Sequence, residues 1–502
     1  MEHPIKRPTY EEHVSELFTP EDAGCMSWAI DLTSYTGIKA NASKISDWIG
    51  SGRMPPPNEG RAWSQEKLQT FRNWAANAGY AEKPFVRLLP SSSQRLRRSI
   101  HELEGDDLET LKKAFNGIMN RDWDTEDPTS YFNLAGIHWL PGPTTNTYCR
   151  HHDDAYNPWH RAYLLAFEDA LRSVEGCENV TLPYWDILGD ELPDWMYEEP
   201  FHAYKFPHRL VSLDGTDSYE IDESSQRFPA AQIRQNIIDE AGNIEVKIGE
   251  ALNANTWRDF NGWSDWPNRH EGIIRAHDNG HGTCGATIAN QDVAAFDPLF
   301  WFFHCNWDRL WWKWQTNNNR RSLLAFEEVV TGDKYWLEEK PDTLLAPFDV
   351  NSAEMIDLSD WNVDYVHPAN EVLNFDPIIA SGQGSTSGLE AFSVSTTTRY
   401  SVRVKDIDRL NIRGSFTVQL FSGEKIVGKS RIFQPSTPQT CSNCQKHGLF
   451  SLDFIVDSED VSAENNLRLQ IVAMDKNGEP QEIPLSQIGN PTLNIRLLLD
   501  TH

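Results

Sequence analysis

A change in the hydrophobic pattern near residue 385 constrains the fold of this chain more than any other feature. Before the Gly/Ser-rich segment 381–388, apolar residues recur every three or four positions, which is typical of helices packed on a core. After it the period is two, as in Tyr400, Val402 and Val404. One hydrophobic face cannot follow both periods. The sequence therefore predicts a mainly α core, a flexible linker and a C-terminal all-β domain of sandwich type.

The length of 502 residues exceeds what one hydrophobic core usually organises, so several domains are expected. The pattern divides the chain into a small N-terminal helical region (1–90), the helical core (91–370), the linker (371–388) and a β-rich domain (389–502).

The formal net charge of −29 argues against nucleic acid and anionic membranes as partners, since both would repel the chain. No apolar run approaches the roughly 20 residues that span a bilayer. The first residues lack the apolar stretch of a secretory signal, and the seven cysteines are too sparse for a disulfide framework. We therefore expect a cytoplasmic protein. Its oligomeric state stays open, a homo-oligomer included.

The clearest helix start in the core carries a histidine. In Asn157-Pro158 the asparagine suits the helix cap and the proline suits the first turn. The apolar face that follows places His160 in the core. His151 lies nine residues earlier and would fall on the opposite face of one continuous helix. Because Pro158 interrupts the helix, His151 can converge with His160 on one ion.

A second helix start, Asp297-Pro298, places His304 on an inner face in the same way. Asp308, one turn later, could orient His304 through a hydrogen bond. Upstream, His277 and His281 are four residues apart, a spacing that lets two imidazoles share a metal ion if the helix persists.

These core histidines could hold a metal ion or could be ordinary buried residues. A single core histidine bonded to a backbone carbonyl is commoner than a ligand. Burying several imidazoles without partners, however, would cost roughly a few kcal/mol each, and a metal satisfies them together. An all-imidazole set favours copper or zinc over magnesium or calcium. A dinuclear zinc hydrolase that recruits Asp153 and Asp154 is one interpretation.

The motifs around these histidines resemble those of the tyrosinase family, across nearly the whole helical core. The first copper motif resembles Gly136-Ile137-His138-Trp139, Cys149-Arg150-His151 and Trp159-His160-Arg161. The second resembles His277-Asp278-Asn279-Gly280-His281 and the run from Asp297 to Trp311. The resemblance implies a four-helix bundle with two copper ions, one bound by His138, His151 and His160 and the other by His277, His281 and His304.

The same resemblance implies the chemistry. O2 would be the co-substrate, and the partner would be a small phenolic or catecholic molecule. Monophenols would be hydroxylated at the ortho position, and catechols would be oxidised to ortho-quinones. The alternatives are a catechol oxidase or ortho-aminophenol oxidase without monophenol hydroxylation, and a non-enzymatic dinuclear copper oxygen carrier.

Cys149 indicates which of the adjacent residues His151 and His152 is the copper ligand. In fungal-type tyrosinases a cysteine two residues before a ligand becomes thioether-linked to it. The resemblance therefore implies a Cys149–His151 thioether, and leaves His152 as a neighbour or a surface residue.

The chain departs from the family pattern where a base for phenol deprotonation is expected. Asp278 stands where many tyrosinases have asparagine, and Glu271 is the nearest candidate for a glutamate that is out of register. Both are candidate catalytic residues. Asp278 could equally face solvent, because an aspartate before Asn279-Gly280 often ends a helix. Phe303, where the family often has another histidine, is expected only to fill space.

Residues 389–502 resemble the β-rich domain that covers the copper site of long tyrosinases and keeps them latent. Phe433 is the candidate plug of this lid, and ordinary sandwich core is its alternative. Cys441 and Cys444 resemble a CxxC linked to copper loading. Taken alone, such a motif could equally be a redox pair, half a zinc site or two spare thiols.

Overall fold

The computed structural model describes residues 4–5, 7–56, 60–76, 86–123, 127–141, 148, 150–262, 270–340, 343–366, 399–461, 467–474 and 480–498. The chain forms two compact units, one of Met1–Leu89 with Asp333–Ile356 and one of Pro90–Gly332 with Asp357–His502. This division differs from the expected one in two ways. A segment of the expected core joins the first unit, and the β-rich domain groups with the core. The linker 371–388 lies outside the described residues.

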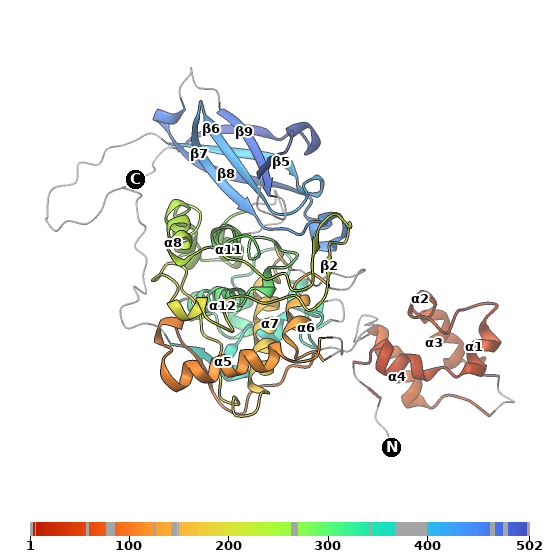
Figure 1. Ribbon diagram of the computed structural model, residues 1–502. Helices are drawn as coiled ribbons and strands as arrows, with labels where there is room; N and C mark the ends of the chain where they lie inside the picture. Colours follow the sequence, from red (N-terminus) through yellow and green to blue (C-terminus); the bar gives the residue numbers. More distant parts are fainter. Residues whose placement is uncertain are drawn as a thin grey trace. The chain divides into compact units, whose positions relative to one another are not determined.

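The first unit is helical. Its helices are α1 (Pro20–Met26), α2 (Tyr35–Ala40), α3 (Ala42–Gly50) and α4 (Gln65–Ala76) (Figure 1). Ser64 accepts a hydrogen bond from the Lys67 amide at the start of α4. Phe71 and Trp74 of this helix are buried in the core that the four helices share.

The helical core of the second unit confirms the expected α class. Its helices are α5 (Gly105–Met119), α6 (Tyr131–Gly136), α7 (Tyr156–Arg172), α8 (Ala230–Asp239), α9 (Glu245–Leu252), α10 (Trp257–Asn261), α11 (Gly272–Cys284), α12 (Leu299–Asn317) and α13 (Leu323–Glu327). Helix α7 packs against α5 and α12, while α11 packs against α8, α9 and α10. Both α7 and α12 are buried along almost their whole length.

The helix boundaries differ locally from the expected ones. Helix α7 begins at Tyr156, so Asn157 is not its cap; the Asn157 amide instead donates to Asn261 Oδ1 at 3.1 Å. Before α12, Asp297 Oδ1 does accept the Leu299 N–H, at 2.9 Å. Helix α11 continues through Asn279-Gly280, because tertiary burial overrides weak local propensity.

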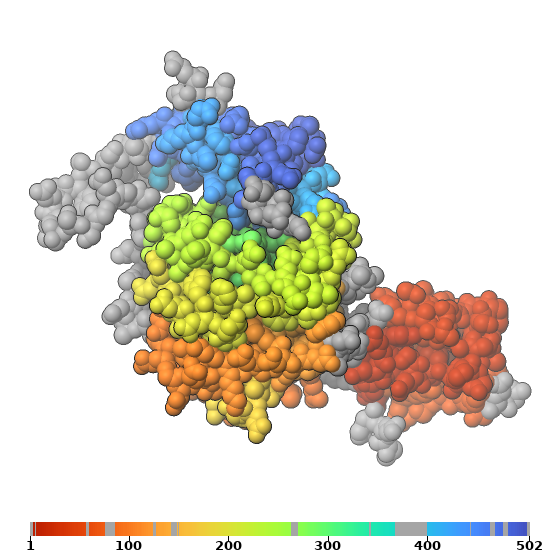
Figure 2. All heavy atoms as spheres, viewed as in Figure 1, coloured from red at the N-terminus to blue at the C-terminus, as the bar shows by residue number. Residues whose placement is uncertain are grey.

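The C-terminal strands form the expected sandwich. They are β5 (Arg399–Asp408), β6 (Phe416–Ser422), β7 (Lys425–Ile432), β8 (Leu449–Asp457), β9 (Leu467–Met474), β10 (Pro480–Glu482) and β11 (Thr492–Leu498). One sheet has the order β10-β9-β6-β7 and the other β11-β5-β8, with antiparallel pairing throughout. The sequence did not predict β7, because most residues of this edge strand are exposed or half-buried and the strand lacks a clear alternation. Strand β7 contacts α11, so the β domain lies directly on the helical core (Figures 1 and 2).

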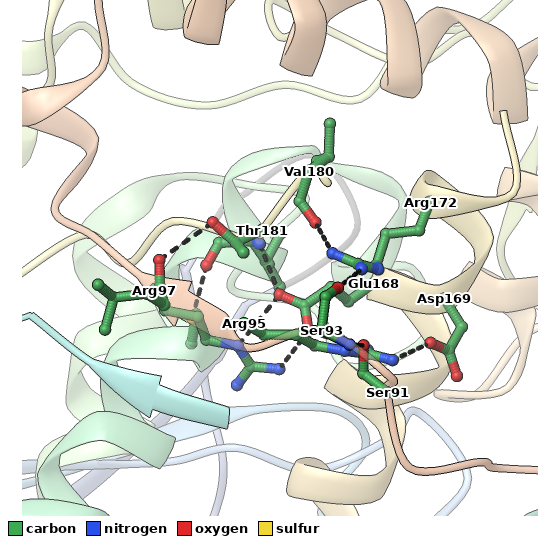
Figure 3. Close-up of polar contacts among 12 residues, drawn as sticks. Ser91, Ser93, Arg95, Arg97, Glu168, Asp169, Arg172, Val180 and Thr181 are labelled. Carbon is green, nitrogen blue, oxygen red and sulfur yellow. Dashed lines mark hydrogen bonds and ion pairs between the residues drawn. The ribbon is translucent and has the colours of Figure 1, made fainter. Parts of the chain in front are cut away.

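A network of buried charges joins the short strand β1 (Arg95–Arg97) to α7. Arg95 and Arg97 both donate to the Glu168 carboxylate, as Figure 3 shows. Asp308 on α12 accepts hydrogen bonds from Arg97 at 3.2 Å and Arg161 at 2.6 Å. These buried ion pairs fix helices α7 and α12 relative to each other, since either carboxylate alone would be an unpaired buried charge.

Candidate metal centre

The first histidine group comes from three places in the sequence. His138 follows α6, His151 precedes α7 and His160 lies in the first turns of α7. All three are buried, and their candidate ligand atoms lie within 4.8 Å of one another. The Nδ1–H of His160 donates to the Tyr156 carbonyl at 2.9 Å, and that of His138 donates to the Gln291 carbonyl at 3.2 Å. Because a carbonyl only accepts, Nε2 of each ring carries the lone pair.

The second group is formed by α11 and α12. His277 and His281 lie on α11 and His304 lies on α12, all within the same 4.8 Å limit. The Nδ1–H of His281 donates to the Ile288 carbonyl at 2.7 Å, and that of His277 donates to Asp278 Oδ1 at 3.0 Å. Nε2 of His281 lies 2.9 Å from Nε2 of His277 and 3.3 Å from Nε2 of His304.

These contacts fit a bound metal ion in each group. In the second group, two lone pairs face each other at 2.9 Å, an arrangement that a shared cation stabilises. In the first group, Nε2 of His138 and of His160 is buried with no hydrogen-bond partner among the described residues. Burial lowers the pKa of both His138 and His160 to about 3, so both rings are neutral at neutral pH. Neutral, convergent imidazoles suit copper or zinc.

The two groups face each other and form one centre. The rings of His160 and His304 stack with centroids 4.5 Å apart and planes 9° apart. Those of His151 and His277 lie 5.5 Å apart. The arrangement suits two metal ions side by side.

Phe433 lies against this centre and not in the interior of the sandwich. Its ring stacks on His281, with centroids 3.9 Å and planes 11° apart, and lies 5.3 Å from His151. It is fully buried and directly follows β7. The β domain therefore places an aromatic ring over the histidines.

Asp278 is buried inside α11, so the alternative that it faces solvent is wrong. Its Oδ2 accepts hydrogen bonds from His152 Nε2 at 2.7 Å, His270 Nε2 at 2.9 Å and the Phe433 amide at 3.0 Å. Burial raises the pKa of Asp278 well above its ordinary value, while the Phe433 amide and Arg409 lower it. His152 is only 1% exposed, so of its two expected placements, a neighbour of the ligands or a surface residue, the structure has the first.

Two other predicted carboxylates lie elsewhere. Glu271 precedes α11 and forms ion pairs with Lys247 at 2.8 Å and Arg275 at 3.0 Å. The described contacts of Asp308 are with Arg97, Arg161 and Tyr365, and none is with His304, which corrects its expected role. The position of each carboxylate relative to the histidines suggested its role, but the sequence could not reveal the cations that pair with it.

The remaining candidates are placed as follows. The Phe303 ring packs against the His281 ring, with centroids 4.7 Å apart, and fills space, as predicted. The buried Cys441 Sγ accepts the Cys444 N–H at 3.2 Å, at the start of α14 (Ser442–Lys446). The adjacent Asn443 donates to the His151 carbonyl, so this motif lies beside the loop of the first group. Cys149, and with it the thioether, lies outside the described residues.

The sequence interpretation missed three buried residues around Asp278: His152 as a partner, His270 and Arg409. His152, His270 and Asp278 also form a third cluster of potential ligand atoms. No such cluster in the described part of the chain includes Asp153 or Asp154, the pair that the zinc interpretation requires. Among the helices that the structure describes, none is both long and apolar enough to cross a bilayer.

Comparison with known proteins agrees with this centre. Residues 128–317 match the family model described as the common central domain of tyrosinase. A tyrosinase of Aspergillus oryzae is 24% identical over 71% of this chain and 88% of its own length. The structure of a Burkholderia thailandensis tyrosinase covers 80% of this chain and 100% of its own, with a TM-score of 0.58 and 17% identity. A structure titled as latent and active mushroom tyrosinase covers 83% and 98%, with a TM-score of 0.53 and 18% identity.

Proposed function

We propose that this chain, a copper-dependent oxidoreductase of the tyrosinase family, uses O2 to hydroxylate monophenols at the ortho position and to oxidise catechols to ortho-quinones. The observation that carries the proposal is the pair of buried three-histidine groups that face each other. His138, His151 and His160 would hold one copper ion, and His277, His281 and His304 the other. When bound, the copper pair supplies O2 binding and electron transfer.

The protein's own residues prepare the site. Backbone carbonyls hold Nδ1–H of His138, His160 and His281, so Nε2 of each ring points toward the centre. Burial keeps the rings neutral, and the surrounding aromatic side chains exclude water. Oriented neutral imidazoles favour metal binding over protonation.

The stacked ring of Phe433 supports a small phenol or catechol as the substrate. The Phe433 ring covers the face of His281, with centroids 3.9 Å apart, and so occupies the place where another planar aromatic ring could stack. We propose that Phe433 is the plug of a latent form and that substrate enters once the β domain is displaced. Cys441 and Cys444, beside the loop of His151, are proposed to take part in copper loading.

Asp278 is the favoured proton acceptor for a monophenol. Glu271, the other candidate, is already paired with Lys247 and Arg275. Displacing the β domain would break the hydrogen bond from the Phe433 amide to Asp278 Oδ2. That oxygen could then accept a hydrogen bond from another donor. Catechol oxidation does not depend on this base.

The proposal is tested by measuring O2 uptake. A protease site is introduced into the linker 371–388, the full chain is loaded with copper, and the chain is then cleaved. Uptake with a catechol and a monophenol would support the full activity. Uptake with a catechol or an ortho-aminophenol alone would indicate the narrower oxidases. Two bound copper ions without any turnover would contradict the proposal and favour an oxygen carrier.

A further inference from the structure

A chain of hydrogen bonds runs from the β domain to a histidine of the second group. It begins at Arg409, in the turn Arg409–Asn411 after β5, and passes through His152 and Asp278 to His277. All four residues are at most 1% exposed. Arg409 and His152 are separated by 257 residues in the sequence.

The chemistry of arginine sets the direction of these bonds. A guanidinium group can only donate, so the contact of 2.7 Å between Arg409 Nη1 and His152 Nδ1 makes that ring nitrogen an acceptor. The proton of the neutral His152 ring must then lie on Nε2. That nitrogen is 2.7 Å from Asp278 Oδ2 and donates to it. Arg409 therefore selects the tautomer of His152.

Asp278 in turn fixes the orientation of the His277 ring. With Oδ2 held by His152 and His270, Oδ1 faces His277 and accepts its Nδ1–H at 3.0 Å. His277 is thereby left with Nε2 pointing to the metal position. Carboxylates that hold a ligand histidine in this way fix its tautomer and its orientation.

Arg409 is itself fixed within the β domain. Its Nε donates to Gln434 Oε1 at 2.8 Å, and its Nη2 lies 3.8 Å from Cys444 Sγ. The neighbour of Gln434, Phe433, donates its amide to the same Asp278 oxygen. Two groups of the β domain thus act on Asp278, the Phe433 amide directly and Arg409 through His152.

We propose that Arg409 is a positioning residue of the copper centre: by setting the tautomer of His152 it orients Asp278 and His277, so the β domain helps to build the second copper site that it covers. The inference rests on the proposed function in that it takes His277 as a copper ligand. It assigns the covering domain a role in metal affinity that is separate from blocking access.

The cluster of His152, His270 and Asp278 could alternatively hold a third metal ion, since its potential ligand atoms lie within 4.8 Å of one another. Arg409 argues against this reading. A metal on His152 Nε2, together with an arginine donor on Nδ1, would require a ring without any proton. The hydrogen bonds from Arg409 to His277 therefore predict two copper ions per chain. A third ion at this cluster would overturn the proposal.

The decisive variant is Arg409→Met, which removes the donors and keeps much of the volume. The expected results in the uncleaved chain are a roughly 10- to 100-fold loss of affinity for one of two copper ions and loss of the Nε2–H signature of His152. Affinity is measured by copper titration with a competing chelator, and the tautomer by nitrogen NMR of ring-labelled histidines in the metal-free protein. Arg403→Met is the control. Arg403 lies in the same domain and pairs with Asp453, outside the hydrogen-bond chain from Arg409 to His277. It should leave both readouts unchanged.

A second pair of variants covers the case in which Arg409→Met does not fold. His152→Gln can accept from Arg409 and donate to Asp278, so it should retain wild-type copper affinity, whereas His152→Leu should lose it for one ion. Equal affinities for Gln and Leu, or an unchanged tautomer in Arg409→Met, would overturn the proposal. If the wild-type chain bound no copper, the proposed function would fail. The NMR result would still show whether Arg409 sets the tautomer of His152.

Discussion

At the scale of single residues, Phe433 is the side chain with the most direct consequence for activity. Replacing it with alanine removes the ring that stacks on His281. We expect the uncleaved, copper-loaded Phe433→Ala chain to oxidise a small catechol, whereas the uncleaved wild type does not. The lost packing should lower the free energy of unfolding by about 3–5 kcal/mol.

Phe450→Ala is the control for this prediction. Phe450 is equally buried but lies in the sandwich beside Phe416, with ring centroids 6.1 Å apart. Its loss should cost a similar amount of stability without releasing activity. Equal O2 uptake by both variants would show that destabilising the β domain, not removing the plug, opens the site.

The metal-free protein should lose stability in acid through its buried histidines. Burial lowers the pKa of His138 and His160 from 6.5 to about 3. Between these values the unfolded chain binds protons that the folded chain does not, so the free energy of unfolding falls as pH falls through this window. The contribution is fully present above pH about 6.5 and lost below about 3.

Thermal unfolding of metal-free protein across this pH range measures the effect. A His138→Gln/His160→Gln double variant is the comparison, because glutamine does not titrate there. Its melting temperature should depend less steeply on pH than that of the wild type. Parallel curves for the two proteins would contradict the stated origin of the acid sensitivity.

At the scale of elements, Gly262 determines how α10 meets α11. Its φ is +87°, and a Cβ atom there would lie 1.8 Å from the Glu271 carbonyl oxygen. The Glu271 amide also donates to the Gly262 carbonyl at 3.0 Å, so the end of α10 is fixed to the start of α11. Gly262→Ala should therefore shift α11, which carries His277 and His281.

We expect Gly262→Ala to lower the free energy of unfolding by more than about 2 kcal/mol, from backbone strain and the clash together. It should also lower the bound copper toward one ion per chain. Gly249→Ala is the control, since Gly249 lies within α9 with nothing within 4 Å of the added Cβ. That change should stabilise the helix by up to about 1 kcal/mol. Urea unfolding and metal analysis distinguish the two variants.

At the scale of the whole molecule, the formal net charge of −29 should influence which catechols reach the centre. A cationic catechol is attracted to the protein and an anionic one is repelled. For the cleaved enzyme at low salt, we expect kcat/KM to favour a catechol with an ammonium side chain over one with a carboxylate. The ratio should fall toward one as salt shortens the Debye length to below about 10 Å.

Steady-state O2 uptake at several salt concentrations measures this ratio. A neutral catechol serves as the reference, because its kcat/KM should not change with salt. A preference that persists unchanged at high salt would mean that contacts within the site, and not the overall charge, discriminate between the substrates.

The amino-acid sequence by itself determined the α core, the β sandwich and the six histidines. The α core and the β sandwich depend on local patterns, because the apolar period reports which face of an element is buried. The set of six histidines rests on the resemblance to the tyrosinase motifs, which alone indicated His138. The tertiary structure alone decided the partners of the buried polar groups. Local spacing suggested that Asp308 orients His304, but Arg97 and Arg161 bind it instead. Arg409 lies 257 residues from His152, and only the packing of the β domain on the core brings them together. Periodicity defines a face of an element, whereas a buried charge pairs with whichever donors the folded chain places within reach.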